Sequence, residues 1–110
     1  MLMRSLIFVG LLFGALCMSA KQYQFKIGKL KYDGGGDWYA NPSSLPNLIR
    51  FVNLSTNTQV ATQEDVVEAT GTQIFQYPYV YMTGHGNVQF TDAEVKNLRN
   101  YMISGGFLHI

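Results

Sequence analysis

The sequence has little charge and almost no cysteine. Only 14% of its 110 residues are charged, whereas soluble domains usually have about 25%. Its single cysteine, Cys17, lies in an apolar segment close to the N-terminus. If this segment is removed after Ser19 or Ala20, the mature protein has no cysteine. That excludes a disulfide framework, a thiolate zinc site and a cysteine nucleophile.

An excess of charge of one sign is also missing. The chain has eight Lys and Arg residues, one of which is Arg4, against seven Asp and Glu residues. Residues 21–110 therefore carry equal numbers of the two signs. This balance excludes a strongly basic nucleic-acid-binding protein and an acidic disordered tail. Without residues 1–20 the chain is long enough for one domain but not for two.

The first twenty residues have the pattern of an export signal. A positively charged start with Arg4 precedes an apolar stretch over residues 5–16, and the small residues Ser19 and Ala20 follow. About twelve apolar residues are too few to span a bilayer, which needs roughly twenty. We expect residues 1–20 to be the signal peptide of an exported bacterial protein, periplasmic or secreted. The alternative is an uncleaved anchor over residues 2–18, which would be the protein's only membrane contact.

Hydrophobic periodicity predicts alternating strands and helices in the rest of the chain. Apolar residues alternate over residues 23–32, which predicts a strand, and a change of phase beyond Gly28 predicts a bulge there. Over residues 45–52 the apolar residues recur at helical spacing. Ser44 is the expected N-cap of this helix.

The second half of the chain repeats the alternation. A short strand is expected at residues 66–67, and residues 74–75 fit a single helical turn. The continuous apolar run over residues 77–82 is typical of a central strand covered on both faces. Thr91 and Glu94 have the spacing of a capping box. They precede a helix whose apolar face is expected to contain Val95, Leu98, Met102 and Tyr101.

The resulting order, β-α-β-β-α-β, predicts an α/β fold with a mainly parallel sheet. Gly105 and Gly106 end the second helix, and a last strand occupies residues 107–110. Residues 21–110 are expected to form a single α/β domain. Because no helix follows to cover the last strand, we expect this domain to be incomplete.

Two glycine-rich segments, residues 33–37 and residues 83–87, each follow a predicted strand. In open α/β sheets, ligands bind beyond the carboxyl ends of the strands. If the two strands are neighbours, both segments lie on one rim of the domain. The predicted ligand-binding residues are Asp33, Asp37, Trp38, Tyr39, Thr83, His85 and Asn87.

The polar residues of this rim also have structural interpretations. His85 either acts on a ligand, as a base, metal ligand or hydrogen-bond donor, or bonds Asp37 to hold its loop. Residues 34–36 lack both the Gly-x-Gly-x-x-Gly register and the lysine of a P-loop, so no nucleotide is predicted. One histidine with Asp33 and Asp37 is a metal signal of low specificity. We therefore predict no metal and no other cofactor.

The aromatic residues are open to two interpretations as well. Trp38 and Tyr39 either stack on a ligand or pack over the helix start. The tyrosines at positions 77, 79 and 81 are expected to pack within their strand, and His109 is expected to pair or pack in the last one. Without a basic patch these rings do not form a base-stacking platform, so no nucleic-acid partner is predicted.

Several motifs together resemble one protein family. They are Gly-Gly-Asp-Trp at residues 35–38, Thr-Gly-His-Gly at residues 83–86, Phe-Thr-Asp-Ala-Glu at residues 90–94 and Gly-Gly-Phe-Leu at residues 105–108. From about residue 25 to residue 110 the chain is similar to the bacterial domain of unknown function 4159 family, a set of exported or membrane-associated proteins. The resemblance implies a flavodoxin-like α/β fold, similar to that of the class I glutamine amidotransferase-like superfamily. Family members usually continue beyond the last motif, which implies that this chain is the N-terminal portion of a larger domain.

The resemblance does not supply a reaction, because the family has none established and the amidotransferase cysteine has no counterpart here. We expect an exported protein with a non-catalytic rim that binds an unknown small molecule or an envelope protein. One alternative is a hydrolase that uses His85 and Asp37, with or without a metal. The other is a structural module of an envelope complex, in which the glycine segments only shape turns.

Overall fold

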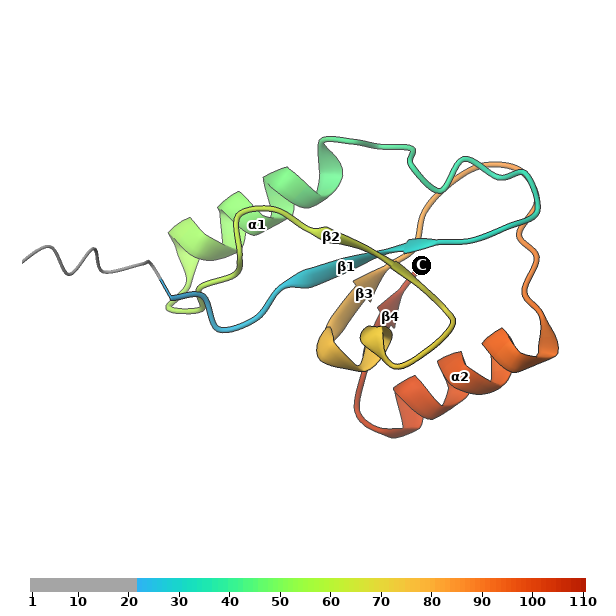
Figure 1. Ribbon diagram of the computed structural model, residues 1–110. Helices are drawn as coiled ribbons and strands as arrows, with labels where there is room; N and C mark the ends of the chain where they lie inside the picture. The colour runs from blue at the N-terminus through green and yellow to red at the C-terminus, as the bar shows by residue number, and fades with distance from the viewer. Residues whose placement is uncertain (1–21) are drawn as a thin grey trace, which may run out of the picture.

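A computed structural model describes residues 22–110, and the predicted signal peptide lies outside these described residues. The elements follow the predicted order, with a short 3₁₀ helix, η1, between the second and third strands (Figure 1). They are β1 (Ile27–Lys31), α1 (Ser44–Ser55), β2 (Asp65–Glu68), η1 (Gln73–Gln76), β3 (Tyr79–Tyr81), α2 (Asp92–Ile103) and β4 (Phe107–His109).

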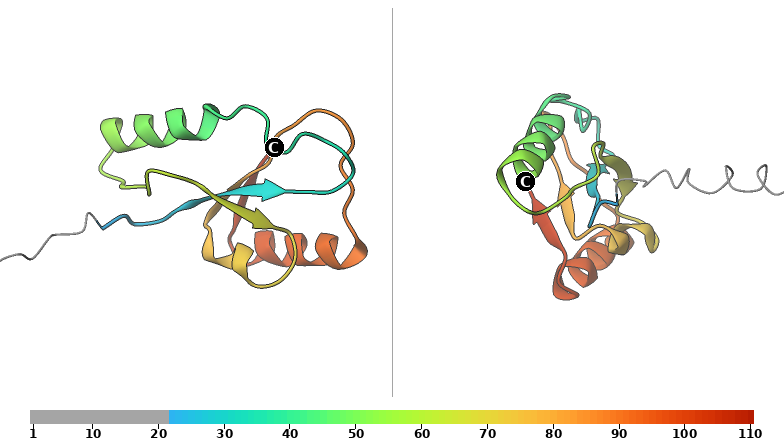
Figure 2. Two further views of the ribbon diagram at one scale, coloured as in Figure 1. Left: turned by 45° about the horizontal axis from the view of Figure 1, so that its top comes forward. Right: turned by 90° about the vertical axis from the view of Figure 1, so that its left-hand side faces the viewer.

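The four strands form one parallel sheet in the order β2-β1-β3-β4. The α/β prediction is therefore confirmed, and the sheet is parallel throughout. Helix α1 covers one face and α2 the other (Figures 1 and 2). Since β1 and β3 are neighbours whose helices lie on opposite faces, the strand order reverses between them. Such a switch point is where open α/β sheets form their ligand crevice.

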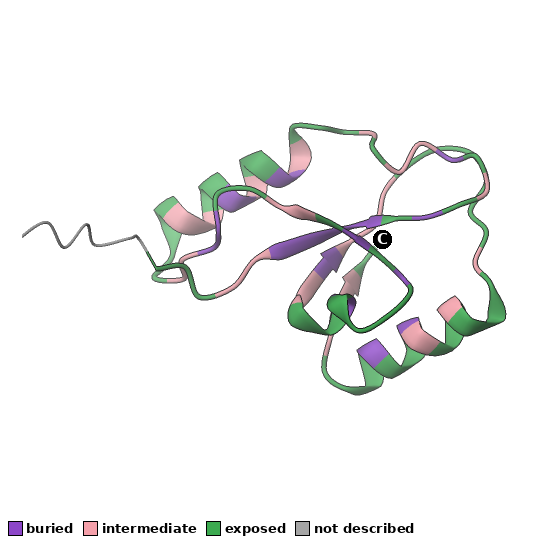
Figure 3. Cartoon of the chain, viewed as in Figure 1, coloured by how far each residue is buried: buried purple, intermediate pink, exposed green. Residues whose placement is uncertain are grey.

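The core has one apolar cluster on each face of the sheet. The cluster between α1 and the sheet contains Ile27, Leu45, Ile49 and Val60. The cluster between α2 and the sheet is larger and contains Leu30, Val67, Ala69, Ile74, Val80, Leu98 and Tyr101. Figure 3 shows the buried residues gathered along β1, which both clusters share. This two-sided burial fixes the strand that leads into the first glycine segment.

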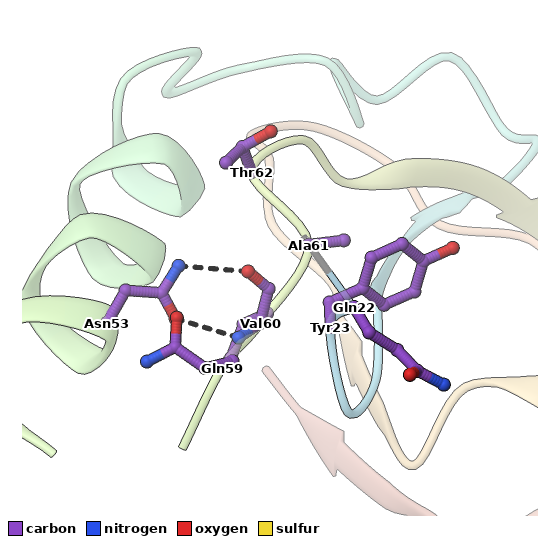
Figure 4. A pocket seen from close by; sticks show the side chains of 7 residues that line it. All are labelled: Gln22, Tyr23, Asn53, Gln59, Val60, Ala61 and Thr62. Atoms are coloured by element: carbon purple, nitrogen blue, oxygen red, sulfur yellow. Dashed lines mark hydrogen bonds between the residues drawn. The ribbon is translucent and has the colours of Figure 1, made fainter. Parts of the chain in front are cut away.

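The side chain of Asn53 ties the end of α1 to the segment that precedes β2. Its Nδ2 donates to the Val60 carbonyl at 2.9 Å, and its Oδ1 accepts from the Val60 N–H at 2.7 Å (Figure 4). Tyr23 lies on the other side of the small hollow beside this pair.

The predicted bulge at Gly28 is wrong. The pairing of β1 with β3 runs from Ile27 through Gly28 without interruption, the pairing with β2 begins at Gly28, and residues 27–30 are all buried. The apolar pattern loses its alternation because both faces of the strand are covered. A glycine is required for a different reason. A Cβ atom here would lie 2.9 Å from Val67 Cγ1 and 3.2 Å from the Tyr77 ring.

The two helix starts differ. The capping box of α2 is confirmed, since the Thr91 hydroxyl accepts from the Glu94 N–H and the Glu94 carboxylate accepts from the Thr91 N–H. The prediction that Ser44 is the N-cap of α1 is wrong. Ser43 holds the N-cap position without a side-chain bond, and the Ser44 hydroxyl donates to the Asn41 carbonyl.

Two further expectations need correction. The strand predicted over residues 77–82 is central, but only Tyr79–Tyr81 pairs as a strand. On α2, Leu98 and Tyr101 are buried, whereas Val95 and Met102 are 45% and 47% exposed. The narrow sheet offers only one stripe of contact, and the Tyr101 hydroxyl fixes the helix by donating to the Tyr77 carbonyl at 2.7 Å. Over residues 22–110, no helix has the length and apolar character needed to cross a membrane.

Candidate functional site

The loops that follow β1 and β3 pair with each other beyond the carboxyl end of the sheet (Figures 1 and 2). The Gly36 N–H donates to the Asn87 carbonyl at 2.9 Å, and the Asp37 N–H donates to the His85 carbonyl at 3.0 Å. A third bond runs from the Gln89 N–H to the Asp33 carbonyl at 2.8 Å. Both glycine segments therefore meet at the switch point, as the neighbouring strands require.

The glycines allow the two loops to approach closely. A Cβ atom on Gly36 would lie 2.7 Å from the Asn87 carbonyl oxygen. On Gly84, whose φ is +136°, a Cβ would lie 2.1 Å from the Tyr32 hydroxyl. These glycines face protein atoms of the other loop, which agrees with the interpretation that the segments are turns and not phosphate cradles.

Asp37 and His85 are joined twice across the paired loops. The Asp37 carboxylate accepts from the His85 backbone N–H through Oδ1, and its Oδ2 lies 3.4 Å from His85 Nδ1. The backbone N–H, followed by the imidazole, lowers the pKa of Asp37. The His85 side chain itself is 84% exposed. The pair thus both holds the loop and leaves the imidazole accessible at the rim.

Thr83 is held by two neighbours. Its carbonyl accepts from the Tyr32 hydroxyl at 2.9 Å, and its own hydroxyl accepts from Asn41 Nδ2 at 3.0 Å. Asn41 has a φ of +54°, in the left-handed region that asparagine tolerates better than most residues. Tyr32 and Asn41 are thus structural parts of the rim that the sequence did not single out.

The other predicted residues are more dispersed. Trp38 and Tyr39 pack against each other edge to face, with ring centroids 5.7 Å apart, and Tyr39 is 65% exposed. Asn87 contributes its backbone carbonyl to the loop pairing. Asp33 does not join Asp37 and His85 in a metal site, since no three His, Cys, Asp or Glu side chains of residues 22–110 lie close enough to hold an ion.

A hollow of about 370 Å³ opens at the carboxyl ends of β3 and β4, beside the paired loops. The hydroxyl-bearing side chains of Tyr81 and Thr83 and the imidazole of His109 form part of its lining. Apolar lining comes from Met82, Val88 and Ile110. As expected, His109 pairs within its strand, opposite Tyr81, and its exposed side chain also lies on the wall of this hollow.

One row of polar residues crosses the sheet next to this hollow. The strand register aligns Lys29 with Tyr81 and Tyr81 with His109. Lys29 is buried, and its Nζ donates to the Ala40 carbonyl at 3.1 Å. The hydroxyls of Thr83 and Ser44 lower the pKa of Tyr81. A lysine within an apolar strand was the available signal for this row, because lysine is rarely buried without a partner.

The imidazole of His109 lies between two tyrosines. The Tyr79 hydroxyl shares a hydrogen bond with Nδ1 of His109, and the Tyr81 ring packs edge-on against the imidazole at 5.2 Å. Burial raises the pKa of Tyr79. These contacts fix the orientation of the imidazole on the wall of the hollow.

Comparison with known proteins agrees with the motifs and the fold. The family model described as domain of unknown function DUF4159 matches residues 26–110. No curated protein matches the chain. Since the match covers every strand and helix of the sheet domain, the protein belongs to the DUF4159 family.

Proposed function

We propose that this is an exported bacterial protein, periplasmic or secreted, with a non-catalytic binding rim at the carboxyl ends of β1, β3 and β4. The observation that carries the proposal is the hollow of about 370 Å³ at the switch-point end of the sheet. Its size falls within the range of small-molecule sites, and its position is the one that this architecture uses for ligands. The export signal pattern over residues 1–20 supports the location.

The lining favours a ligand with both polar and apolar parts. Thr83 and His109 offer hydrogen-bonding groups, while Met82 and Val88 offer apolar surface. On the adjoining loops, His85 is accessible and oriented by Asp37. Such a surface suits a small molecule or a polar segment of an envelope protein, and the balanced charge of residues 21–110 argues against nucleic acid.

A non-catalytic role is favoured by what the rim residues already do. One oxygen of Asp37 accepts a backbone N–H, which makes this carboxylate a brace between the loops. Thr83 is engaged through its carbonyl by Tyr32 and through its hydroxyl by Asn41. These contacts preserve the shape of the rim without requiring a reaction.

A hydrolase is the second candidate, and the Asp37–His85 pair favours it. A carboxylate near Nδ1 orients an imidazole so that Nε2 can act as a general base. The nucleophile would then be a water molecule. The two functions differ in whether a bound ligand is changed.

The single tryptophan allows a direct test, because Trp38 lies on the loop that carries Asp37. We would screen a library of sugars, amino acids and organic acids for changes in Trp38 emission. A hit should bind at least tenfold more weakly to the Thr83→Val and His85→Ala variants, and normally to Gln76→Ala at the other end of the sheet. Equal binding by all variants would refute the rim, and conversion of the hit by the wild type but not by His85→Ala would establish the hydrolase.

A further inference from the structure

A second hollow, of about 390 Å³, lies at the opposite end of the sheet from the rim. It is bordered by the residues that lead into β1 and β3 and by the first residue of β2. Three aromatic residues contribute to its lining, namely Tyr23, Phe25 and Tyr77. Tyr23 is 53% exposed, so part of this aromatic surface is open to a ligand.

A compact polar group lies among these rings. Lys26 Nζ is 2.6 Å from Asp65 Oδ1, and the Tyr77 hydroxyl donates to Asp65 Oδ2 at 2.9 Å. Lys26 and Tyr77 lower the pKa of Asp65, and Asp65 raises the pKa of Lys26, so both groups of the ion pair are charged at neutral pH. The two side chains keep 30% and 40% of their surface exposed.

This arrangement restricts the charge of a ligand. Lys26 repels a cation that approaches Asp65, and Asp65 repels an anion that approaches Lys26. A wholly apolar ligand would remove both charges from water without giving them a new hydrogen bond, which is costly. The hollow therefore favours an uncharged ligand that carries several hydrogen-bonding groups.

Adjacent hydroxyls on a ring match the polar group. A hydroxyl can donate and accept at once, so one of a neighbouring pair can accept from Lys26 while the other donates to Asp65. The C–H face of a sugar ring is apolar and packs on aromatic rings such as that of Tyr23. Both features of the hollow are then used by one ligand.

A further hollow, of about 240 Å³, continues this surface toward the start of β4. The two hollows share Gln76, Tyr77 and Pro78, and the smaller one is also lined by Phe75 and Tyr101. Gln76 is exposed and lies between them. The combined surface has room for more than one ring of a chain.

We propose that the amino end of the sheet is a binding site for neutral saccharides, with Tyr23 as the stacking residue and Lys26 with Asp65 as the diol-binding pair. This site is separate from the proposed rim, and neither proposal depends on the other.

The experiment titrates the full-length chain with methyl β-glucoside and with cellohexaose by isothermal calorimetry. We expect cellohexaose to bind, with an affinity reduced at least tenfold in Tyr23→Ala and severalfold in Gln76→Ala. Tyr23→Phe keeps the stacking ring and should bind within threefold of the wild type. Tyr39→Ala removes a tyrosine at the opposite end that is even more exposed than Tyr23, and should bind as the wild type does.

The two probes distinguish the source of the saccharide. Tenfold tighter binding of cellohexaose would indicate a polymer, and equal binding of both probes would indicate a free sugar. Trp38 emission should stay unchanged during both titrations, since Trp38 lies at the other end of the sheet. The proposal is overturned if neither probe binds at 10 mM, if Tyr23→Ala binds normally, or if binding changes Trp38 emission and is lost in His85→Ala.

Discussion

Individual residues of the two loops are fixed by contacts across the switch point. Gly84 is surrounded by the Tyr32 hydroxyl and the Asp37 carbonyl, and Asp37 in turn holds the backbone and ring of His85. A change at any one of these positions alters atoms of the opposite loop. Stability measurements can therefore show how much each contact contributes.

Gly84→Ala is expected to destabilise the fold by about 2 kcal/mol or more, because the new Cβ combines a steric clash with an unfavourable positive φ. Gly35→Ala is the matched control, since Gly35 also has a positive φ, +92°, but no atom lies within 4 Å of a Cβ there. That variant should cost about 1 kcal/mol, the penalty of the backbone conformation alone. Urea denaturation of both variants measures the difference, and equal losses would contradict the clash.

Asp37→Asn is expected to destabilise the protein at pH 7 and progressively less in acid. The pKa of Asp37 is lowered in the folded state from its ordinary value of 3.8, so its charge stabilises the fold above that pH. The contribution is lost as the pH falls through the lower, folded pKa. Urea midpoints at pH 7, 5 and 3 should therefore converge with those of the wild type. Asp33→Asn on the same loop controls for loss of charge, and a constant difference at all three pH values would count against the prediction.

At the scale of elements, the two helices begin in different ways. Helix α2 has a complete capping box, whereas the N-cap residue of α1, Ser43, makes no side-chain bond. The start of α1 is instead tied to the preceding loop, through the bond from the Ser44 hydroxyl to the Asn41 carbonyl. The start of α2 thus depends on its own sequence, and that of α1 on the rim.

Thr91→Ala should lower the free energy of unfolding by about 1 kcal/mol, because it removes the acceptor for the Glu94 N–H. Ser43→Ala changes the same capping position of α1 and should cost at most a few tenths of a kcal/mol. Thermal unfolding of the two variants side by side gives the comparison. A loss in Ser43→Ala as large as that in Thr91→Ala would show that the capping box is not the cause.

On the scale of the whole molecule, the two edges of the sheet differ. Edge strand β2 begins and ends with acidic residues, Asp65 and Glu68. Edge strand β4 has no carboxylate or lysine, and its Phe107 is 60% exposed. Charged side chains are a common protection against edge-to-edge pairing, so the β4 edge is the less protected of the two.

We expect Phe107→Lys to reduce self-association of the chain at high concentration, because it places a charge on the unprotected edge. Val66→Lys places the same charge on the β2 edge, where Val66 is 54% exposed, and should leave association unchanged. Sedimentation velocity over a range of concentrations measures both. Equal effects of the two variants would mean that net charge, and not the β4 edge, controls association.

Local patterns in the sequence predicted much of this protein. Helical spacing placed both helices, the Thr91–Glu94 spacing identified the capping box, and the family motifs predicted the α/β fold. Two of the errors share one physical origin. At Gly28 and along α2, the observed pattern depends on which faces other elements cover, and local periodicity does not contain that information.

The candidate site was predictable in position but not in detail. Glycine segments after two strands indicated the rim, because the carboxyl ends of parallel strands share one edge of a sheet. The pairing of the loops, the position of His109 on a hollow and the row from Lys29 to Tyr81 all depend on strand order and register. Residues far apart in the chain become neighbours only when β1 and β3 pair.

By itself, the sequence determined the element types, the balance of charge and the glycines without which the loops could not approach. The tertiary structure decided what those glycines contact and which polar groups share a wall. It also created the hollow at the amino end of the sheet, where Lys26, Asp65 and Tyr77 meet from three separate segments. The reason is that hydrogen bonds and clashes depend on distances of a few ångströms, which the fold sets and the order of residues does not.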